Sequence, residues 1–444
     1  MKKRRFFTFA IISILLILAF LNFTSPKNAN KIDLPSLEDK KIENLSKDQY
    51  VEDFEFAYNT LETYYPYFDI NKKVNNIDWL AKKDSYKKYI EDSKNDVDFG
   101  LRMNKILYEL NNDHTHLIDQ NQSVYMYINY YKLPENDWRH DISKIYEKEN
   151  VRRRYKLDNK KIDNYLEYNQ YEIMSKITPK NVLVGNAKDG FSNGNNLNGE
   201  NISTKKINKD IAYLKINSML NYDYSSKDHK KIKSYLKKIK NKKALIIDIR
   251  GNTGGDSRYW QDFLLPSIID KPYSTKYYSF IKKGDLNKKV ISQEKYNEGV
   301  SGFLNESNFS NETKEILSKF DYYTNYPILV NPSEDSIKFK GHIYLLIDST
   351  VYSSAEMLAS FCKETKLATL VGSQSKGDGI GTDPLQIDLP NSGYVLRFPK
   401  EIGLTESGYI NEIEKTNPNI SIDSNRYDEI KEQPIIQKII EMEG

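Results

Sequence analysis

The stretch that decides the fold runs from Ala244 to Gly255 and reads ALIIDIRGNTGG. Its first half is an almost continuous apolar run, which is typical of a strand buried on both faces of a sheet. The glycines that follow permit positive φ angles and leave backbone amides open to a ligand. The turn therefore indicates an oxyanion hole, a phosphate-binding loop or an ordinary tight turn. Its spacing does not match the P-loop pattern, and the chain contains no GxGxxG motif.

Strands and helices are expected to alternate around this stretch, which favours an α/β layer structure. The apolar patterns predict strands at 211–216, 342–347 and 368–371, and helices at 227–240, 258–265 and 354–363. Two more strands are expected near 385–389 and 394–398, joined by a turn at 390–393.

A helical region is predicted upstream, at residues 46–119. Ser46 and Gln49 have the spacing of a capping box, and apolar residues then recur at helical spacing. A further helix is expected at 97–111, and the region ends in a polar turn that contains His114 and His116.

The N-terminus carries a targeting signal. Four basic residues at 2–5 precede an apolar run at 6–21, the pattern with which an export signal begins. Residues 1–23 are therefore expected to be a signal peptide or membrane anchor and 24–45 a tether. Positive charge before the run keeps that end inside, so the rest of the chain is expected on the outer side of the cell membrane or secreted.

Composition limits the function classes. The 444 residues are 39% hydrophobic, enough for a full core and two or three domains. The net charge is only +4, with much of the excess at the N-terminus, so no nucleic-acid partner is expected. Cys362 is the only cysteine, which rules out an internal disulfide, and its apolar surroundings indicate a core position.

Ser353 is the candidate nucleophile because it lies between a predicted buried strand and a predicted helix. A hydroxyl there sits at the positive end of the helix, where free backbone N–H groups stabilise a developing negative charge. The alternative is structural, since Ser353 and Glu356 also have the spacing of a capping box.

A serine nucleophile needs a base, and an imidazole is the usual one. His114 follows a helix in a polar turn and is the candidate, although a solvated loop histidine fits the same pattern. His114 and His116 also suit a metal, but no third ligand stands at a recognisable spacing. Glu412 is a candidate carboxylate to orient the imidazole, one among 62 acidic residues.

Together these segments resemble the C-terminal processing (tail-specific) serine peptidase family, in its tricorn-core-like branch with a Ser-His-Glu catalytic set. Four pieces occur in the family's order. Residues 112–115 stand in place of a D-G-H-T-like turn, and 248–255 match D-x-R-x-N-x-G-G at every fixed position. Residues 353–356 stand for S-A-x-E with the alanine displaced by one, and 411–419 for I-E-G-x-G-V-x-P-D.

The resemblance implies a ClpP/crotonase-like α/β catalytic core at 206–430, followed by a tail at 431–444. Residues 120–205 stay unassigned, with no evident PDZ module. The implied catalytic set is Ser353, His114 and Glu412. The amides of Gly254, Gly255 and Ser354 would form the oxyanion hole. The implied substrate is a peptide or protein, and the implied reaction needs neither a metal nor an organic cofactor.

Several alternatives stay open. Many family members use the lysine of a G-K-G segment as the base; here Gly377-Asp378-Gly379 stands in that place and Lys376 is two residues away, so His114 is favoured. A non-catalytic ligand- or peptide-binding protein on the same fold is a second interpretation. A crotonase-like acyl-CoA enzyme is a third, which the export signal argues against. A structural envelope protein, with Ser353 as a helix cap only, is a fourth.

Overall fold

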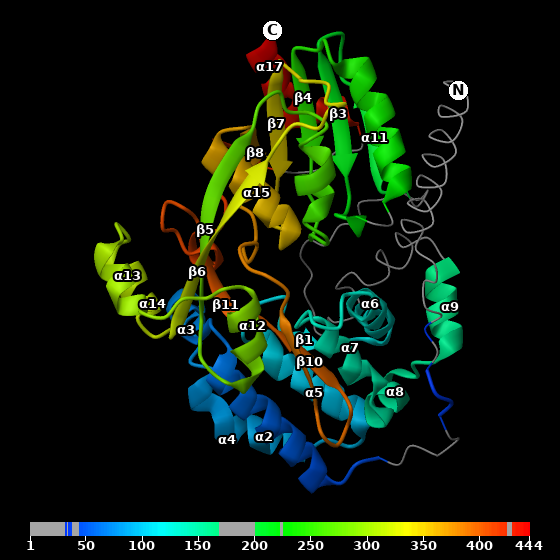
Figure 1. Ribbon diagram of the computed structural model, residues 1–444, viewed down its shortest axis with the longest axis vertical. Helices are drawn as coiled ribbons and strands as arrows, with labels where there is room; N and C mark the ends of the chain where they lie inside the picture. The colour runs from blue at the N-terminus through cyan, green and yellow to red at the C-terminus, as the bar shows by residue number, and fades with distance from the viewer. Residues whose placement is uncertain (1–31, 33, 38–43, 168–199, 223–224, 424–428) are drawn as a thin grey trace, which may run out of the picture.

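The computed structural model describes residues 32, 34–37, 44–167, 200–222, 225–423 and 429–444. The predicted anchor at 1–23 and most of the predicted tether at 24–45 lie outside these residues. Within the described ranges, no helix has both the length and the apolar character needed to cross a bilayer. Figure 1 shows an α/β part that carries the C-terminus and a mostly helical part, linked by a long strand pair.

The α/β part is built on a six-stranded sheet in the order β12-β8-β7-β4-β3-β2. Every residue of β4 is buried, and β4 pairs in parallel with β3 and β7, as its apolar run predicts. The predicted α/β core is confirmed. Its strands are β2 (Ile202–Lys206), β3 (Ile211–Ile216), β4 (Ala244–Asp248), β7 (His342–Ile347), β8 (Thr369–Gly372) and β12 (Ile420–Ser421).

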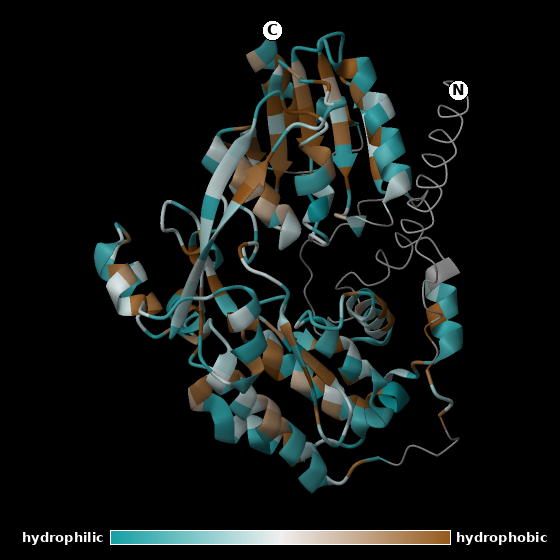
Figure 2. Ribbon diagram, in the orientation of Figure 1, coloured by the Kyte–Doolittle hydropathy of each residue, from teal (hydrophilic) through white to brown (hydrophobic). Residues whose placement is uncertain are grey.

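Helices cover both faces of this sheet, and its strands are the hydrophobic layer between them (Figure 2). One face packs against α11, α15 and a π-helical turn, and the other against α17. The segment predicted as a C-terminal tail thus includes a packed helix that buries Ile435, Ile436 and Ile439. The elements are α11 (Ser226–Ile239), η4 (Tyr259–Leu264), α15 (Ser354–Thr365), α16 (Asn411–Glu414), η6 (Ile430–Glu432) and α17 (Pro434–Glu443).

The helical part begins at the predicted capping box. Ser46 Oγ accepts from the Gln49 N–H at 3.3 Å, and Gln49 Oε1 accepts from the Ser46 N–H at 3.0 Å. Residues 120–167, which the sequence left unassigned, form four helices. The elements are α2 (Lys47–Tyr64), α3 (Phe68–Asn75), η1 (Leu80–Lys82), α4 (Lys83–Glu91), α5 (Asp96–Tyr108), α6 (Gln120–Tyr131), α7 (His140–Glu147), α8 (Glu149–Tyr155) and α9 (Asn159–Glu167).

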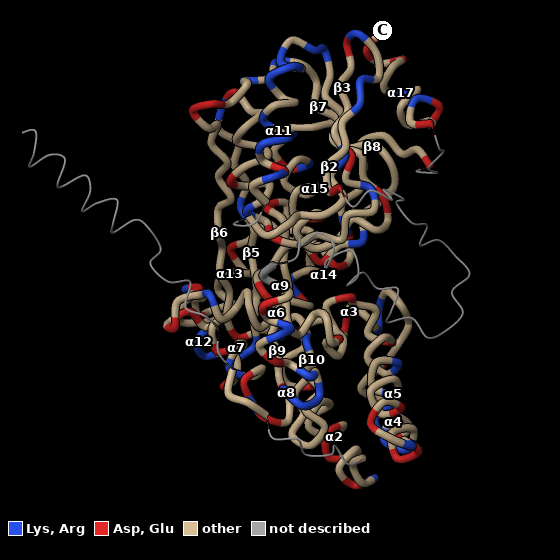
Figure 3. The backbone as a smooth tube through the Cα atoms, turned by 90° about the vertical axis from the view of Figure 1, so that its right-hand side faces the viewer, with Lys and Arg blue, Asp and Glu red and all other residues tan. Residues whose placement is uncertain are grey.

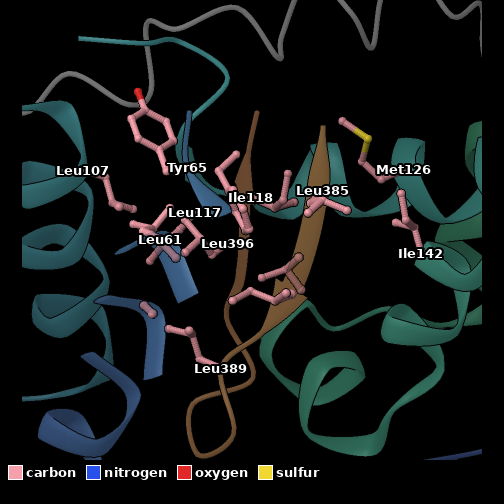
Figure 4. Packing of buried hydrophobic residues seen from close by; sticks show 14 of the residues in the cluster. Leu61, Tyr65, Leu107, Leu117, Ile118, Met126, Ile142, Leu385, Leu389 and Leu396 are labelled. Atoms are coloured by element: carbon pink, nitrogen blue, oxygen red, sulfur yellow. The ribbon is translucent and has the colours of Figure 1, made fainter. Parts of the chain in front are cut away.

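A small antiparallel sheet in the order β1-β10-β9 lies among these helices. The hairpin predicted at 385–398 forms β9 (Leu385–Asp388) and β10 (Val395–Phe398), and β10 also pairs with β1 (His116–Leu117). Figure 4 shows Leu117 and Leu396 beside Leu61 and Leu107 of the flanking helices. This sheet fixes the turn that carries His114 against a segment from the C-terminal half of the chain.

A third sheet, β11-β5-β6, joins the two parts, with three short helices along its connection (Figure 1). Basic and acidic residues are interspersed along the whole molecule (Figure 3). The elements are β5 (Tyr273–Ile281), η5 (Asp285–Asn287), α12 (Lys288–Gln293), α13 (Val300–Glu306), α14 (Asn311–Leu317), β6 (Tyr322–Val330) and β11 (Glu401–Leu404).

Candidate active site

Ser353 stands immediately before the first residue of α15, in a strained backbone conformation. Its φ is 55° and its ψ is −128°, and its side chain makes no capping hydrogen bond. The capping-box alternative is therefore wrong. Positive φ at a non-glycine residue costs on the order of 1–3 kcal/mol and is concentrated at functional sites. The half-buried Ser353 hydroxyl forms no hydrogen bond with a described residue and is free to react.

The glycine turn after β4 is held by a buried ion pair. Arg250 Nη2 donates to Asp248 Oδ2 at 2.6 Å and to Gln433 Oε1 at 2.8 Å. Burial opposes ionisation of Asp248, but the charges of Lys215 and Arg250 outweigh it and keep the pKa of that carboxyl well below its usual range. Removing either partner would leave a buried charge unpaired, so the pair fixes the turn in place.

Gly254 touches the nucleophile segment. A Cβ at this position would lie 2.8 Å from Ser353 Cβ and 2.9 Å from the Ser354 nitrogen, and the φ of Gly254 is +101°. Any side chain would fill the space beside the hydroxyl, so a glycine is required. The Gly254 N–H already donates to Asn252 Oδ1 at 2.9 Å.

Two of the three predicted oxyanion donors stay open. The N–H groups of Gly255 and Ser354 donate no hydrogen bond to any residue in the described ranges. The Gly254 N–H is occupied by Asn252, so Gly254 contributes close approach rather than a donor. The arrangement fits two backbone donors around a developing oxyanion.

His114 is held by its own turn and by a carboxylate. Asn112 Oδ1 accepts from the His114 N–H at 3.0 Å and from Thr115 Oγ1 at 3.1 Å. His114 Nδ1 lies 2.7 Å from Asp378 Oδ2. When Nδ1–H donates to that carboxylate, Nε2 keeps its lone pair and can accept a proton.

Asp378 is the centre of the hydrogen-bond network. Besides His114, Asn112 Nδ2 and the Tyr352 hydroxyl each donate to Oδ2 at 2.7 Å, and the Tyr67 hydroxyl donates to Oδ1 at 2.9 Å. Burial opposes ionisation, but the His114 charge and these donors outweigh it and hold the pKa of Asp378 well below its usual range. Asp378 is therefore an ionised, fixed partner for the imidazole.

Glu412, the carboxylate predicted to orient His114, makes no hydrogen bond or ion pair with that ring among the described residues. Its Oε1 accepts from Asn112 Nδ2 at 3.2 Å, and its Oε2 is buried without a partner. Burial, and then the charge of Asp378, raise the pKa of Glu412 well above its ordinary value. A protonated carboxyl cannot offset an imidazolium charge, and Asp378 makes the hydrogen bond expected of Glu412.

Lys376, the alternative base, is engaged elsewhere. Its Nζ pairs with the Asp113 carboxylate and lies 5.7 Å from the centre of the Tyr352 ring. The sequence analysis missed Asp378, Tyr67 and Tyr352 as site residues. A carboxylate between two glycines, at the position where the resembled family has its lysine, was the available signal for Asp378.

His114 lies beside Tyr352, the residue that precedes Ser353. The His114 ring centre lies 4.7 Å from that of Tyr352, the residue next to Ser353, but His114 and Ser353 share no hydrogen bond. Catalytic hydrogen bonds are often long in substrate-free enzymes and tighten on binding. A pocket of about 220 Å³ opens beside Tyr352, and Ile70, Lys376, Glu412 and Lys415 are among its lining residues.

Glu356, which follows Ser353 by three residues in the first turn of α15, is a buried acid in the same region. Its Oε1 accepts from Asn411 Nδ2 and Thr416 Oγ1, each at 2.7 Å, while Oε2 has no partner. Burial raises the pKa of Glu356 to about 7. The folded chain therefore keeps this proton at pH values where the unfolded chain releases it. The resulting stability is present at low pH and is lost as the pH rises towards 7.

Replacing Glu356 with glutamine removes this dependence. The free energy of unfolding of Glu356→Gln is compared with that of the wild type at each pH. The difference should shift in favour of the variant by about 3 kcal/mol from about pH 4.5 to about pH 8. Urea unfolding at several pH values measures the difference, and Glu62→Gln on the exposed face of α2 serves as control. A Glu356→Gln difference that does not change with pH would contradict the assignment.

Part of the chain is similar in sequence to a known peptidase family, and its fold is similar to solved structures. Residues 210–422 match the model of peptidase family S41. A candidate peptidase from Parabacteroides merdae has a similar solved structure, with a TM-score of 0.53, 16% identity, and coverage of 90% of this chain and 97% of that one. Mature CPAF in complex with lactacystin gives a TM-score of 0.54 at 12% identity, covering 89% and 98%. No curated protein matches the chain significantly.

The site has the features of the serine hydrolase class. They are a serine placed before a helix, open backbone amides and an imidazole–carboxylate pair. The match to peptidase family S41, which covers most of the α/β core, narrows the class: the chain is a serine peptidase whose substrates are peptides or proteins.

Proposed function

We propose that this peptidase cleaves its substrate through an acyl-enzyme on Ser353, with His114 as general base and Asp378 as the group that holds the imidazole. The observation that carries the proposal is the strained, uncapped Ser353 beside two open backbone N–H groups. When His114 Nδ1–H donates to Asp378, the Nε2 lone pair can accept the serine proton.

The reaction follows from these positions. His114 Nε2 takes the proton from Ser353 Oγ as the oxygen attacks the peptide carbonyl carbon, and the negative carbonyl oxygen is bound by the N–H groups of Gly255 and Ser354. The imidazolium, stabilised by Asp378, gives its proton to the leaving amine as the C–N bond breaks. Water, deprotonated by His114, then releases the acid and restores Ser353. Losing one oxyanion donor typically costs about 3 kcal/mol of barrier.

The pocket beside Tyr352 supports a role in substrate binding. It combines an apolar wall at Ile70, Val74 and Leu110 with the charged groups of Lys376 and Lys415. Tyr352 is shared between this pocket and the Asp378 network, so a side chain bound there would lie next to the reacting serine.

Labelling with a serine-reactive phosphonate tests the proposal. The wild-type chain should lose peptidase activity as one phosphonate attaches at Ser353, located by peptide mass spectrometry. Ser349→Ala, which removes an exposed serine of the same loop, should label like the wild type. Labelling that persists in Ser353→Ala, or peptidase activity that survives complete labelling, would refute the role of Ser353.

We also propose that the enzyme works on the outer side of the cell membrane or is secreted. The basic residues at 2–5 and the apolar run at 6–21 support an exported chain. The same phosphonate, in a form that does not cross membranes, should label Ser353 on intact cells. Labelling only after lysis would reject an external location.

A further inference from the structure

A row of three polar side chains crosses the β1-β10-β9 sheet next to the catalytic turn. His116 of β1 pairs with Arg397 of β10, and Arg397 pairs with Gln386 of β9. Directly opposed residues of antiparallel strands project from the same face. The Tyr146 hydroxyl of α7 donates to Gln386 Oε1 at 2.5 Å, so this is the face that α7 covers. His116 is the first residue of β1 and follows His114 by two residues in the chain.

Each member of this row has a buried nitrogen without a partner. These atoms are His116 Nε2, Arg397 Nε and Gln386 Nε2. The Gln386 residue is only 5% exposed, so water does not replace the missing partner freely. A buried polar group left unsatisfied costs about 1–3 kcal/mol. Three in one cross-strand row call for a ligand that supplies the missing contacts.

Arg397 differs from every other described arginine. It makes no hydrogen bond or ion pair with a residue in the described ranges. Each of the others donates to a carboxylate or a backbone carbonyl; they are Arg102, Arg139, Arg152, Arg153, Arg154, Arg250 and Arg258. Because a guanidinium stays charged, Arg397 is a half-buried cation without a counter-ion among the residues that the structure describes.

The groups around Arg397 do not neutralise it. Burial raises the pKa values of Tyr125, Tyr130 and Tyr146, and the charge of Arg397 offsets part of that rise, so these phenols are near it and stay neutral. The nearby Asp383 already accepts from the Tyr130 hydroxyl at 3.0 Å and from Arg139 Nη1 at 3.2 Å. An anion for Arg397 must therefore come from elsewhere.

His116 is the neutral end of the row. Burial, and then the charge of Arg397, lower the pKa of His116 to about 4. Its Nδ1–H donates to the Asp113 carbonyl at 2.9 Å, which leaves Nε2 as a hydrogen-bond acceptor. The charge and the donors that an anion needs thus come from Arg397 and Gln386.

We propose that this row is a substrate subsite that binds a carboxylate of the peptide, with Arg397 as the charged anchor and Gln386 as a second donor. The inference rests on the proposed peptidase function. A planar guanidinium matches a carboxylate with two parallel hydrogen bonds. A peptide offers that group at its C-terminus or on an Asp or Glu side chain, and both sources fit the same chemistry.

Hydrolysis of one fluorogenic peptide series in three forms distinguishes the two sources. The forms carry a free C-terminus, a C-terminal amide, or an amide with a glutamate added. For the form whose carboxylate is bound, Arg397→Gln should lower kcat/KM by about 10- to 100-fold, mainly through KM. The uncharged amide should change by less than about twofold, and Arg397→Lys should recover part of the loss. Arg102→Gln, which breaks a surface pair with Asp98, is the matched control.

A loss confined to the free terminus assigns the terminal carboxylate, and one confined to the glutamate form assigns a side chain. An equal loss for all three forms, or none, overturns the subsite. Anisotropy of fluorescein-labelled versions on full-length Ser353→Ala gives a readout without catalysis: Arg397→Gln should remove the preference for the carboxylate form. Phosphonate labelling of Arg397→Gln shows separately whether Ser353 is intact, so failure of the peptidase mechanism and failure of the subsite are distinguishable.

Discussion

Ser353→Ala is expected to lower kcat for peptide hydrolysis by about 10⁴- to 10⁶-fold, because it removes the proposed nucleophile. What activity remains would come from binding and the oxyanion donors alone. Folding should be kept or slightly improved, since the variant loses an unbonded oxygen. Active-site titration, single-turnover kinetics and thermal unfolding together measure both effects.

Ser349→Ala provides the comparison, because Ser349 is exposed on the same loop and makes no hydrogen bond with His114 or the glycine turn. It should retain wild-type kinetics. If Ser353→Ala keeps more than about a hundredth of wild-type kcat, another nucleophile or an activated water carries the reaction.

Asp378→Asn is expected to lower kcat by about 10³- to 10⁴-fold with little change in fold. The amide keeps the shape of the carboxylate, but it loses the charge that stabilises the imidazolium. Its NH₂ group would also face His114 Nδ1 and favour the tautomer that places the proton on Nε2, where the base must be free. The pH dependence of kcat/KM and the ring proton resonances of His114 would report this change of tautomer.

The variant Glu412→Gln distinguishes the role of Glu412 from that of Asp378. Because burial and the charge of Asp378 keep Glu412 protonated, the amide is a close substitute, and kcat should fall by less than about tenfold. A larger loss in Glu412→Gln than in Asp378→Asn would return the orienting role to Glu412. Similar large losses in both would mean that the two carboxyls act as one unit.

The strands of the core were predictable because local pattern and final environment agree. The run at 244–249 is apolar throughout, and β4 is buried throughout; the helix at 354–363 and the strand at 342–347 follow the same logic. Only part of the small β1-β10-β9 sheet could be predicted from the sequence. Its hairpin has a turn signal and two apolar runs, whereas β1 is two residues long and owes its pairing entirely to β10.

In the site, too, some residues could be predicted from the sequence and others could not. Ser353, His114 and the glycine turn stand in segments whose order and spacing carry a signal. The choice between Asp378 and Glu412 depends on which of two neighbouring carboxyls meets an imidazole from a distant turn, and on which of them four hydrogen-bond donors keep ionised. That balance of burial against donors is set by tertiary packing, and chain order does not encode it locally.

The pairing of β1 with β10 requires that most of the chain has been synthesised before the site can form. The turn with the base is made early, but the carboxylate that steadies it follows 264 residues later, and the strand that anchors the turn comes later still. A chain that is still being synthesised therefore has the histidine but lacks the carboxylate and the strand that position it. Maturation of activity is tied to completion of the polypeptide, which protects a nascent protease and its neighbours from premature cutting.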